Sequence, residues 1–309
     1  MAGIAATPLS GDLNWGVEVQ GVTSAALDDE ATRAGLRQLL HDQGVIVCRN
    51  VEQTAAMQVK LSQVFGPLKE HPVPSVTRAD RDNLPGVIVI ATGPGSCIVE
   101  IEGKPLITWQ PWHFDHAYND EMMYAAVLRS IKTPKDGGRT AFACGIQILN
   151  DMAPAIRARA EKLNVLYNLD LRYDRQRFGL PRGFRQLKPH DNTLSQENDN
   201  GRCAVHPAVW TRPSGEAIFH MCPYGCRGLE GDRSDAAFER LAEVWAEAER
   251  VMKPYYHVWQ PGDMVIWDNT RVLHEATGSN PAEEREIHRT TIKGPDCHGH
   301  WEQPAEAAA

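Results

Sequence analysis

The stretch Trp112-His113-Phe114-Asp115-His116 decides how the rest of this 309-residue chain can be interpreted. If the stretch is extended, alternate side chains share a face, so the His113 imidazole and the Asp115 carboxylate point the same way. An imidazole and a carboxylate on one face supply two thirds of a facial triad, which binds Fe(II) once a second histidine joins it. Taken alone, a His-x-Asp pair is more often a surface polar pair or a buried structural histidine. The metal interpretation therefore depends on residues elsewhere in the chain.

Composition limits the classes of protein to which the chain can belong. Hydrophobic residues make up 42% of the sequence, which is enough for one large domain or two small ones. The formal net charge of −8 comes from both signs mixed along the chain, with no basic stripe, so we expect no nucleic acid partner. No apolar run reaches the length of a membrane span and the N-terminus lacks a signal-peptide pattern, so we expect no membrane association. The seven scattered cysteines predict free thiols and a cytoplasmic location.

Four segments carry helical patterns. Asp235 to Met252 has the clearest one, with apolar side chains on one face and acidic side chains on the other. Thr54 is a candidate cap for a helix that Gly66-Pro67 ends. The other two helices are expected at Leu27 to His41, which Gly44 ends, and at roughly Ile146 to Leu163.

Most of the remaining chain has the texture of short strands separated by turns. The expected strands are Val17 to Val19, Val45 to Cys48, Val87 to Ala91, Ile98 to Ile101, Leu106 to Trp109, Tyr124 to Arg129, Arg139 to Ala143, Val165 to Arg172, Ala204 to Thr211, Ala217 to Met221, His257 to Gln260, Asp263 to Asp268 and Glu286 to Lys293. Residues 174–202 lack periodicity, so we predict a long loop or lid there. This pattern predicts a mainly β fold, a sandwich or jelly roll with helices packed outside it. No glycine fingerprint joins a strand to a helix, which argues against a nucleotide-binding α/β fold.

A second group of polar and aromatic residues lies far downstream of the His-x-Asp pair. The segment from Trp259 to Asn269 contains a Pro-Gly-Asp turn that leads into a buried strand, and His274 follows it. Arg285 and Arg289 are four residues apart around the last predicted strand, so both can face the same side. Each also has an ordinary interpretation. A single histidine is more often buried for packing, and Arg285, which has glutamates on both sides, is more often half of a surface ion pair.

Together these segments resemble the taurine dioxygenase (TauD/TfdA-like) family of Fe(II)/2-oxoglutarate-dependent dioxygenases. The matching motifs, in chain order, are Trp112-His113-Phe114-Asp115, Gly137-Gly138-Arg139-Thr140, Pro261-Gly262-Asp263, Trp267-Asp268-Asn269, His274, and Arg285 with Arg289. Their order and spacing both fit, and the resemblance extends over residues 44–294. It implies a double-stranded β-helix (jelly-roll, cupin-like) core and a single dioxygenase domain over residues 1–309, with 174–202 as a lid or loop insertion.

The resemblance also implies roles for the motif residues. His113, Asp115 and His274 match the iron ligands of the family. Thr140 matches the threonine that hydrogen-bonds the C5 carboxylate of 2-oxoglutarate, and Arg285 matches the arginine that forms a salt bridge with it. The chemistry agrees with these matches. The triad leaves three positions on Fe(II), two for 2-oxoglutarate and one for O2. A guanidinium holds a carboxylate in a fixed bidentate geometry that an ammonium lacks.

Other matches concern the surroundings of the iron and the outcome of the reaction. Trp267 matches an aromatic residue packed beside the iron site, and Arg289 matches the arginine that holds the substrate anion in members acting on sulfonates. Related halogenases have a small residue at the position of Asp115, so this carboxylate favours hydroxylation, with release of succinate and CO2. His116 and His288 match no family role and are expected to be ordinary polar residues.

The substrate side departs from the pattern of taurine enzymes. His71 matches a substrate-side histidine, but Pro74 stands where taurine enzymes place a tyrosine, and Trp109 stands near their asparagine. Phe219 fits an apolar pocket wall. Further candidate pocket residues from loops are Tyr118, Tyr173 and Phe178. These differences predict a small, anionic organic acid with an apolar or aromatic body, its anion near Arg289.

Three other interpretations stay open at this point. The same cofactors could carry out desaturation, epoxidation or oxidative decarboxylation in a biosynthetic pathway. The chain could be a non-catalytic jelly-roll binding protein, although the intact pair of Thr140 and Arg285 argues against this. A zinc hydrolase could use the same triad, but it would leave that pair unexplained. Family members are often dimers or tetramers, which suggests a homo-oligomer by analogy alone.

Overall fold

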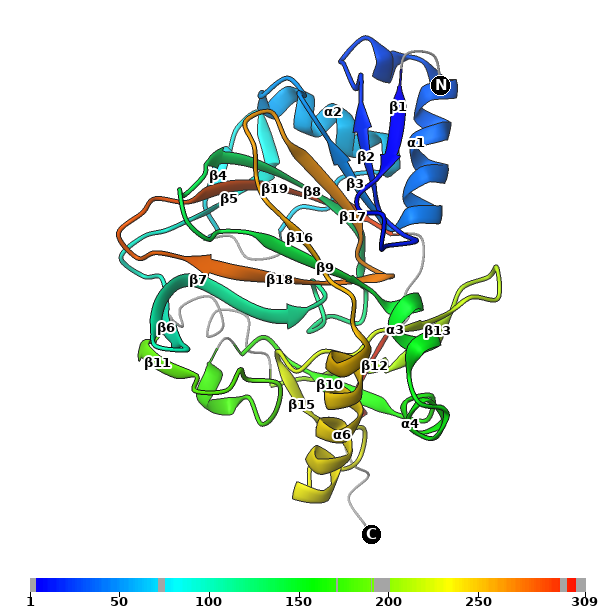
Figure 1. Ribbon diagram of the computed structural model, residues 1–309, viewed down its shortest axis with the longest axis vertical. Helices are drawn as coiled ribbons and strands as arrows, with labels where there is room; N and C mark the ends of the chain where they lie inside the picture. Colours follow the sequence, from blue (N-terminus) through cyan, green and yellow to red (C-terminus); the bar gives the residue numbers. More distant parts are fainter. Residues whose placement is uncertain are drawn as a thin grey trace.

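Two β-sheets face each other across a shared core in the computed structural model (Figure 1). The structure describes residues 4–71, 76–170, 172–189, 191, 201–294 and 299–303. The strands of the larger sheet are, in spatial order, β1 (Ala5–Pro8), β2 (Val17–Gln20), β3 (Val45–Cys48), β17 (Met264–Asp268), β8 (Met123–Lys132), β19 (Glu286–Lys293), β5 (Leu84–Ala91) and β4 (Arg78–Asp80). Those of the facing sheet are β11 (Arg185–Lys188), β6 (Ile98–Ile101), β7 (Lys104–His113), β18 (Val272–Ser279), β9 (Thr140–Cys144) and β16 (Tyr255–His257).

Strands that are distant in the sequence pair with each other in both sheets. In the larger sheet β8 pairs with β17 and β19, and in the facing sheet β18 pairs with β7 and β9, all antiparallel. The core between the sheets takes side chains from both, among them Trp267 and Val265 from β17, Phe142 from β9 and Val272 from β18. This arrangement is the jelly roll with flanking helices that the sequence predicted.

Two helices cover the outer face of the larger sheet, as Figure 1 shows. Helix α1 (Glu30–Gln43) begins where the Asp29 side chain accepts a hydrogen bond from the Thr32 N–H, and it ends at Gly44, whose φ of 77° is left-handed. Helix α2 (Ala55–Phe65) begins at Thr54, whose hydroxyl accepts from the Met57 N–H. The predicted cap of α2, Thr54, and the predicted end residues Gly44 and Gly66 are therefore confirmed, whereas the Asp29 cap of α1 was not predicted.

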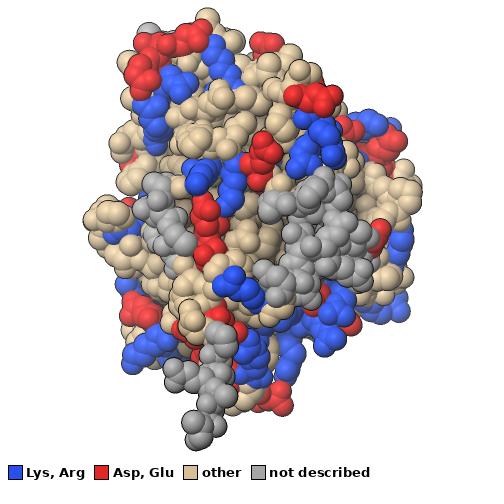
Figure 2. All heavy atoms as spheres, turned by 180° about the vertical axis from the view of Figure 1, so that it is seen from behind, with Lys and Arg blue, Asp and Glu red and all other residues tan. Residues whose placement is uncertain are grey.

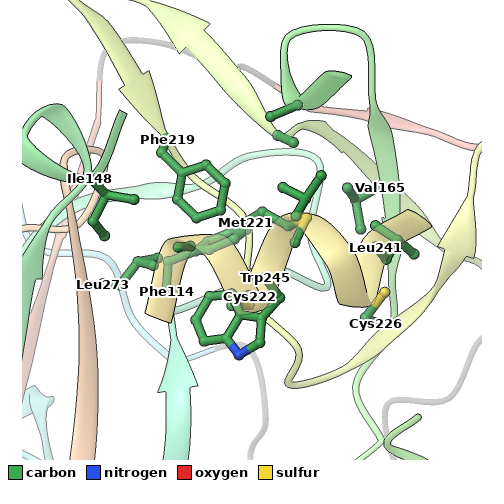
Figure 3. Packing of buried hydrophobic residues seen from close by; sticks show 14 of the residues in the cluster. Phe114, Ile148, Val165, Phe219, Met221, Cys222, Cys226, Leu241, Trp245 and Leu273 are labelled. Carbon is green, nitrogen blue, oxygen red and sulfur yellow. The ribbon is translucent and has the colours of Figure 1, made fainter. Parts of the chain in front are cut away.

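A further layer, at the bottom of the view in Figure 1, packs beside the facing sheet and contains most of the other helices. It is built from β15 (Cys226–Leu229), β10 (Asn164–Tyr167), β12 (Ala204–Pro207), β20 (His300–Trp301), the hairpin of β13 (Val209–Thr211) and β14 (Ala217–Phe219), and the helices α3 (Gly145–Asp151), α4 (Pro154–Ala160) and α6 (Asp235–Val251). Short 3₁₀ turns are η1 (Ala26–Asp28) and η2 (Tyr173–Arg175). The apolar face of α6 packs Leu241 and Trp245 into a cluster that also holds Phe114 and Phe219 (Figure 3).

Several predicted elements differ from those in the structure. Residues 174–202 were predicted as a loop, but β11 lies within them and pairs with β6. The strand predicted at Val165 to Arg172 ends at Tyr167, and Leu171 lies outside the described residues. The strand predicted at His257 to Gln260 lies earlier, at β16. The helical interlude is two short helices, and the strand β18 was not predicted at all.

The described residues include no helix that is long and apolar enough to cross a membrane. On the face shown in Figure 2, basic and acidic side chains both occur, in keeping with the mixed charge of the sequence.

Candidate active site

The register of β7 and β18 places His113 and His274 opposite each other. The two residues are cross-strand partners, and their ring centroids lie 4.0 Å apart. The Nε2 atoms of His113 and His274 lie 3.9 and 3.8 Å from carboxylate oxygens of Asp115. One ligand atom from each of the three buried residues lies within 4.8 Å of the others. A single ion could therefore contact all three side chains, which come from segments far apart in the sequence.

Asp115 lies in a turn rather than on the strand. Strand β7 ends at His113, so Asp115 does not share a strand face with His113 as an extended stretch would require. The fully buried Asn269 fixes the turn instead. Its Oδ1 accepts from the Asp115 N–H at 2.8 Å, and its Nδ2 donates to the Asp115 carbonyl at 3.0 Å and to the Met123 carbonyl at 3.3 Å. Asn269 is therefore a positioning residue for the carboxylate.

We expect an Asn269→Ala variant to bind metal more weakly and to be less stable. Unpaired backbone groups in the buried turn would lower the free energy of unfolding by about 3 kcal/mol. A less constrained Asp115 would weaken Mn(II) binding roughly 10- to 100-fold. Titration of the protein with Mn(II), together with thermal melts, measures both effects. Asn280→Ala is the matched control, because the side chain of the exposed Asn280 makes a single hydrogen bond, which it accepts from the Ala282 N–H. Unchanged Mn(II) affinity in Asn269→Ala would show that other contacts hold Asp115.

The surroundings of the triad favour the protonation states that bind a divalent metal. The Nδ1 of His113 lies 2.7 Å from the Pro111 carbonyl, so an N–H there donates and Nε2 is left as the ligand atom. Burial lowers the pKa of His113 and of His274. Burial by itself would raise the pKa of Asp115, but Arg289 and the imidazoles outweigh it and hold the pKa below its usual value. Two neutral imidazoles and a carboxylate are the forms that a metal needs.

Arg289 faces the triad from β19. Its Nη1 lies 2.8 Å from Oδ2 of Asp115, and both side chains are 11% exposed. Its Nε is buried and has no hydrogen-bond acceptor among the described residues. One end of the guanidinium therefore supports the carboxylate, while the N–H of Nε is left without an acceptor in the described chain.

The first residue of β9, Thr140, lies close to the triad. Thr140 pairs with Ala276 of β18, two residues beyond His274. The buried Thr140 hydroxyl accepts a hydrogen bond from Trp259 Nε1 at 3.2 Å. Because the indole can only donate, the hydroxyl hydrogen remains available for another acceptor. The contact with Trp259 was not predicted from the sequence, although Trp259 begins the segment that contains the Pro-Gly-Asp turn.

Arg285 is a buried cation without an anionic partner. It is 6% exposed, and none of the ion pairs among the described residues involves it. The one hydrogen bond of its side chain within the described chain runs from Nε to the Gly138 carbonyl at 3.4 Å. Burial lowers the pKa of Arg285 to about 10. A buried charge is costly unless it is paired, so this guanidinium indicates that an anion binds here.

Gly137 and Gly138 form a tight turn before β9, and the Gly138 carbonyl accepts a hydrogen bond from Arg285. Their φ values are 76° and 66°, both left-handed. A Cβ on Gly138 would lie 2.4 Å from Pro134 Cγ and 3.5 Å from Arg285 Cδ. The Gly-Gly-x-Thr motif is therefore the backbone turn that brings the arginine stem and the threonine strand together.

Trp267 packs against the triad from the larger sheet. Its ring centroid lies 4.8 Å from that of His274, and the side chain is fully buried. This packing limits the rotation of the His274 ring, and a role for Trp267 beside bound iron stays a prediction.

A cavity of about 170 Å³ borders the triad. Besides the triad residues His113 and Asp115, it is lined by His71, Gln110, Phe114, His116, Ala117, Tyr118, Asn168, Leu169, Asp170, Tyr224, Gly225 and Arg289. Of the residues predicted to contact substrate, His71, Tyr118 and Arg289 line this cavity. Trp109 and Phe219 are not among the lining residues, and each packs in a hydrophobic cluster. Pro74 lies outside the described residues.

The aromatic residues Trp109 and Tyr173 form a cluster that packs against Tyr224, one of the residues lining the cavity. The Tyr173 hydroxyl donates to the Trp109 carbonyl at 2.8 Å, and Trp109 Nε1 donates to Glu275 at 3.1 Å. Phe178, another predicted pocket residue, belongs to the cluster under α6 with Phe219. These residues stabilise the walls behind the site rather than line it.

Comparison with known proteins agrees with this geometry. The chain matches the family described as Taurine catabolism dioxygenase TauD, TfdA family, over residues 5–291. The chain belongs to the TauD/TfdA family. It is therefore an Fe(II)/2-oxoglutarate-dependent dioxygenase that acts on a small molecule, and the predicted family, enzyme class and cofactors are confirmed.

Two characterised relatives and one solved structure illustrate the breadth of the TauD/TfdA family. The (S)-phenoxypropionate/alpha-ketoglutarate-dioxygenase of Sphingobium herbicidovorans is 25% identical over 287 residues, covering 92% of this chain and 93% of that protein. Pentalenolactone F synthase of Streptomyces arenae is 26% identical over 210 residues, covering 65% of this chain and 67% of the synthase. A taurine dioxygenase from Burkholderia xenovorans shares the fold with a TM-score of 0.70 and 21% identity, covering 98% of this chain and 97% of that one.

The residues present fit the cofactors of the TauD/TfdA family. The triad offers two nitrogens and one carboxylate within reach of one ion, which is the donor set of non-haem Fe(II) oxygenases. Arg285 is a buried cation that forms no ion pair with any described carboxylate, as expected of a site for a dicarboxylate such as 2-oxoglutarate.

Proposed function

We propose that His113, Asp115 and His274 bind Fe(II), and that Thr140 and Arg285 bind the distal carboxylate of 2-oxoglutarate. The observation that carries this proposal is the unpaired, buried Arg285 beside a strand that pairs with that of His274. When bound, Fe(II), 2-oxoglutarate and O2 together supply an oxidant that breaks an unactivated C–H bond, with succinate and CO2 as the other products.

The chain itself binds, orients and excludes water in this reaction. Arg285 offers a charged fork and Thr140 a single O–H, so together they fix both the position and the rotation of the distal carboxylate. Trp259 holds the Thr140 hydroxyl in one orientation, and Trp267 keeps water away from the far side of His274. Asn269 holds the backbone of Asp115, so the carboxylate keeps its place as ligands exchange.

We further propose that the substrate is a small organic acid and that the enzyme adds a hydroxyl group to it. Its anion would lie near the free Nε of Arg289. The apolar body that the sequence predicted relied partly on Trp109 and Phe219, which lie behind the cavity walls. The cavity instead offers Leu169, Tyr118 and Tyr224 as apolar surface among several polar groups. Desaturation or epoxidation by the same cofactors is the second candidate outcome. A cytoplasmic location and a homo-oligomeric state also remain predictions.

An Arg289→Gln variant is expected to bind acids roughly 10- to 100-fold more weakly, because a buried charge-assisted hydrogen bond is lost. Isotherms for a panel of carboxylates, sulfonates and sulfate esters measure this effect. The exposed Arg139→Gln is the matched control and should bind them as the wild type does. Identical isotherms for Arg289→Gln and the wild type across the panel would show that Arg289 does not bind the substrate anion.

The proposed cofactor site has a direct test. Anaerobic addition of Fe(II) and 2-oxoglutarate should give the visible charge-transfer band of a chelated keto acid, and O2 should then convert 2-oxoglutarate to succinate. Absence of both signals with Fe(II), or turnover supported by Zn(II) alone, would overturn the assignment of these residues.

A further inference from the structure

His116 is buried beside the candidate iron ligands, yet its imidazole has no hydrogen-bond partner. The residue is 3% exposed, and both Nδ1 and Nε2 are without a partner among the described residues. A buried polar group left unpaired costs about 1–3 kcal/mol. A hydrogen-bonding partner from outside the described chain would therefore stabilise the ring.

The backbone at His116 is held in an unusual conformation. Its φ is 62°, in the left-handed region that non-glycine residues adopt only rarely. The turn is closed by a hydrogen bond from the Asn119 N–H to the His116 carbonyl at 3.0 Å, and Asn269 fixes the preceding residue. Such strain persists where the surrounding structure imposes it, as at binding sites. Here it places the imidazole at the cavity rather than in the core.

The ring of His116 and the guanidinium of Arg289 line the same cavity. The His116 ring centroid lies 6.1 Å from that of His71 and 5.7 Å from that of Tyr118, so the imidazole stands among ring side chains at the cavity wall. Arg289 contributes the Nε–H that also has no acceptor among the described residues. One cavity thus contains two separate polar groups that a bound molecule can satisfy.

We propose that His116 determines specificity by binding a hydroxyl group of the substrate, while Arg289 binds its anion. This inference rests on the proposed function of the cavity. An oxyanion only accepts hydrogen bonds, so it can satisfy Arg289 Nε but not an accepting ring nitrogen. A hydroxyl both donates and accepts, so it fits the imidazole in either tautomer. The substrate class is therefore a hydroxylated organic acid rather than a simple acid with an apolar body.

Matched pairs of acids that differ by one hydroxyl test the proposal. The probes are phenylpropionate with phenyllactate, and hexanoate with hydroxyhexanoates substituted at each carbon. Their dissociation constants are measured by calorimetry on protein loaded with Mn(II) and N-oxalylglycine, so no turnover is required. The wild type should prefer at least one hydroxylated member roughly 10-fold, the size of one added hydrogen bond. His116→Phe, which keeps a ring but removes both nitrogens, should abolish this preference.

Two further variants keep the test decisive. His116→Asn keeps a donor and an acceptor and tolerates left-handed backbone, so it should retain part of the preference. His116→Gly removes the nitrogens without strain and replaces His116→Phe if that variant does not fold. No preference in the wild type across the panel, or an equal preference in the variants without nitrogens, overturns the proposal. Binding of 2-oxoglutarate by Mn(II)-loaded samples prepared without N-oxalylglycine tests the cofactor site separately, because Arg285 does not depend on His116.

Discussion

A His274→Ala variant is expected to lose Fe(II) binding and, with it, oxidation coupled to 2-oxoglutarate. Loss of a residue that merely supports a ligand already costs roughly 10- to 100-fold in metal affinity, so loss of a ligand should cost more than about 100-fold. The remaining pair, His113 and Asp115, cannot enclose the ion from the side of β18. Metal titration followed by equilibrium dialysis measures the affinity, and succinate formation under O2 measures the turnover.

The exposed His41→Ala is the control for this experiment, since it removes an imidazole of the same chemistry from the surface. It should leave both readouts unchanged. The fold of His274→Ala should survive without metal, because the core between the sheets is built from hydrophobic side chains. Retention of Fe(II) affinity within a few-fold of the wild type would show that the triad is not the iron site.

An Arg285→Gln variant is expected to bind 2-oxoglutarate more weakly without becoming less stable. Removing one partner of a buried charge pair costs about 2–5 kcal/mol, so the dissociation constant of 2-oxoglutarate should rise at least roughly 30-fold. The ligand-free protein should melt at the same temperature or higher, because the variant no longer buries an unpaired cation. A residue with a purely structural role would show the opposite, with lower stability and unchanged affinity.

Arg285→Lys refines this prediction. An ammonium keeps the charge but loses the bidentate geometry, so its affinity for 2-oxoglutarate should fall between those of the wild type and Arg285→Gln. Arg139→Gln again serves as the matched arginine control, since Arg139 is exposed one residue before Thr140. Equal 2-oxoglutarate affinity in the wild type and Arg285→Gln would remove Arg285 from the co-substrate site.

The elements that could be predicted from the sequence are those with local signals. Helix α6 has a long apolar stripe, and helices α1 and α2 have side-chain caps within their own segments. Strand β18 was missed because Glu275, Thr277 and Gly278 break the alternation that marks a strand. Its strand conformation comes from pairing with β7 and β9 on either side, which is information that a single segment does not contain.

The position of Trp109 shows why the site could be predicted only in part. Trp109 and His113 have the same parity on β7, so regular alternation would put both side chains at the cavity. The register with β18 shifts between His274 and Ala276, because three residues of β7 separate Gln110 from His113 where β18 has two. The extra residue in β7 reverses the alternation, which brings Gln110 to the cavity in place of Trp109. A bulge of this kind leaves no sign in the hydrophobic pattern.

His116 and Asn269 illustrate a second limit. Both residues lie within the sequence motifs, but the motifs assign no role to either. Asn269 matters through its hydrogen bonds, and His116 through its burial without a hydrogen-bond partner. Asn269 could have been found as the polar residue of the Trp-Asp-Asn motif that follows a buried strand. His116 carried no signal of its own in the sequence.

The pairing of β7 with β18 also has a consequence for synthesis of the chain. During translation His113 and Asp115 leave the ribosome long before His274, and the strand that aligns them is not yet made. A nascent chain therefore has only two of three donors and no rigid turn, because Asn269 is also still missing. Fe(II) can then contact all three side chains only after the segment with Asn269 and His274 has been synthesised and β18 has paired with β7.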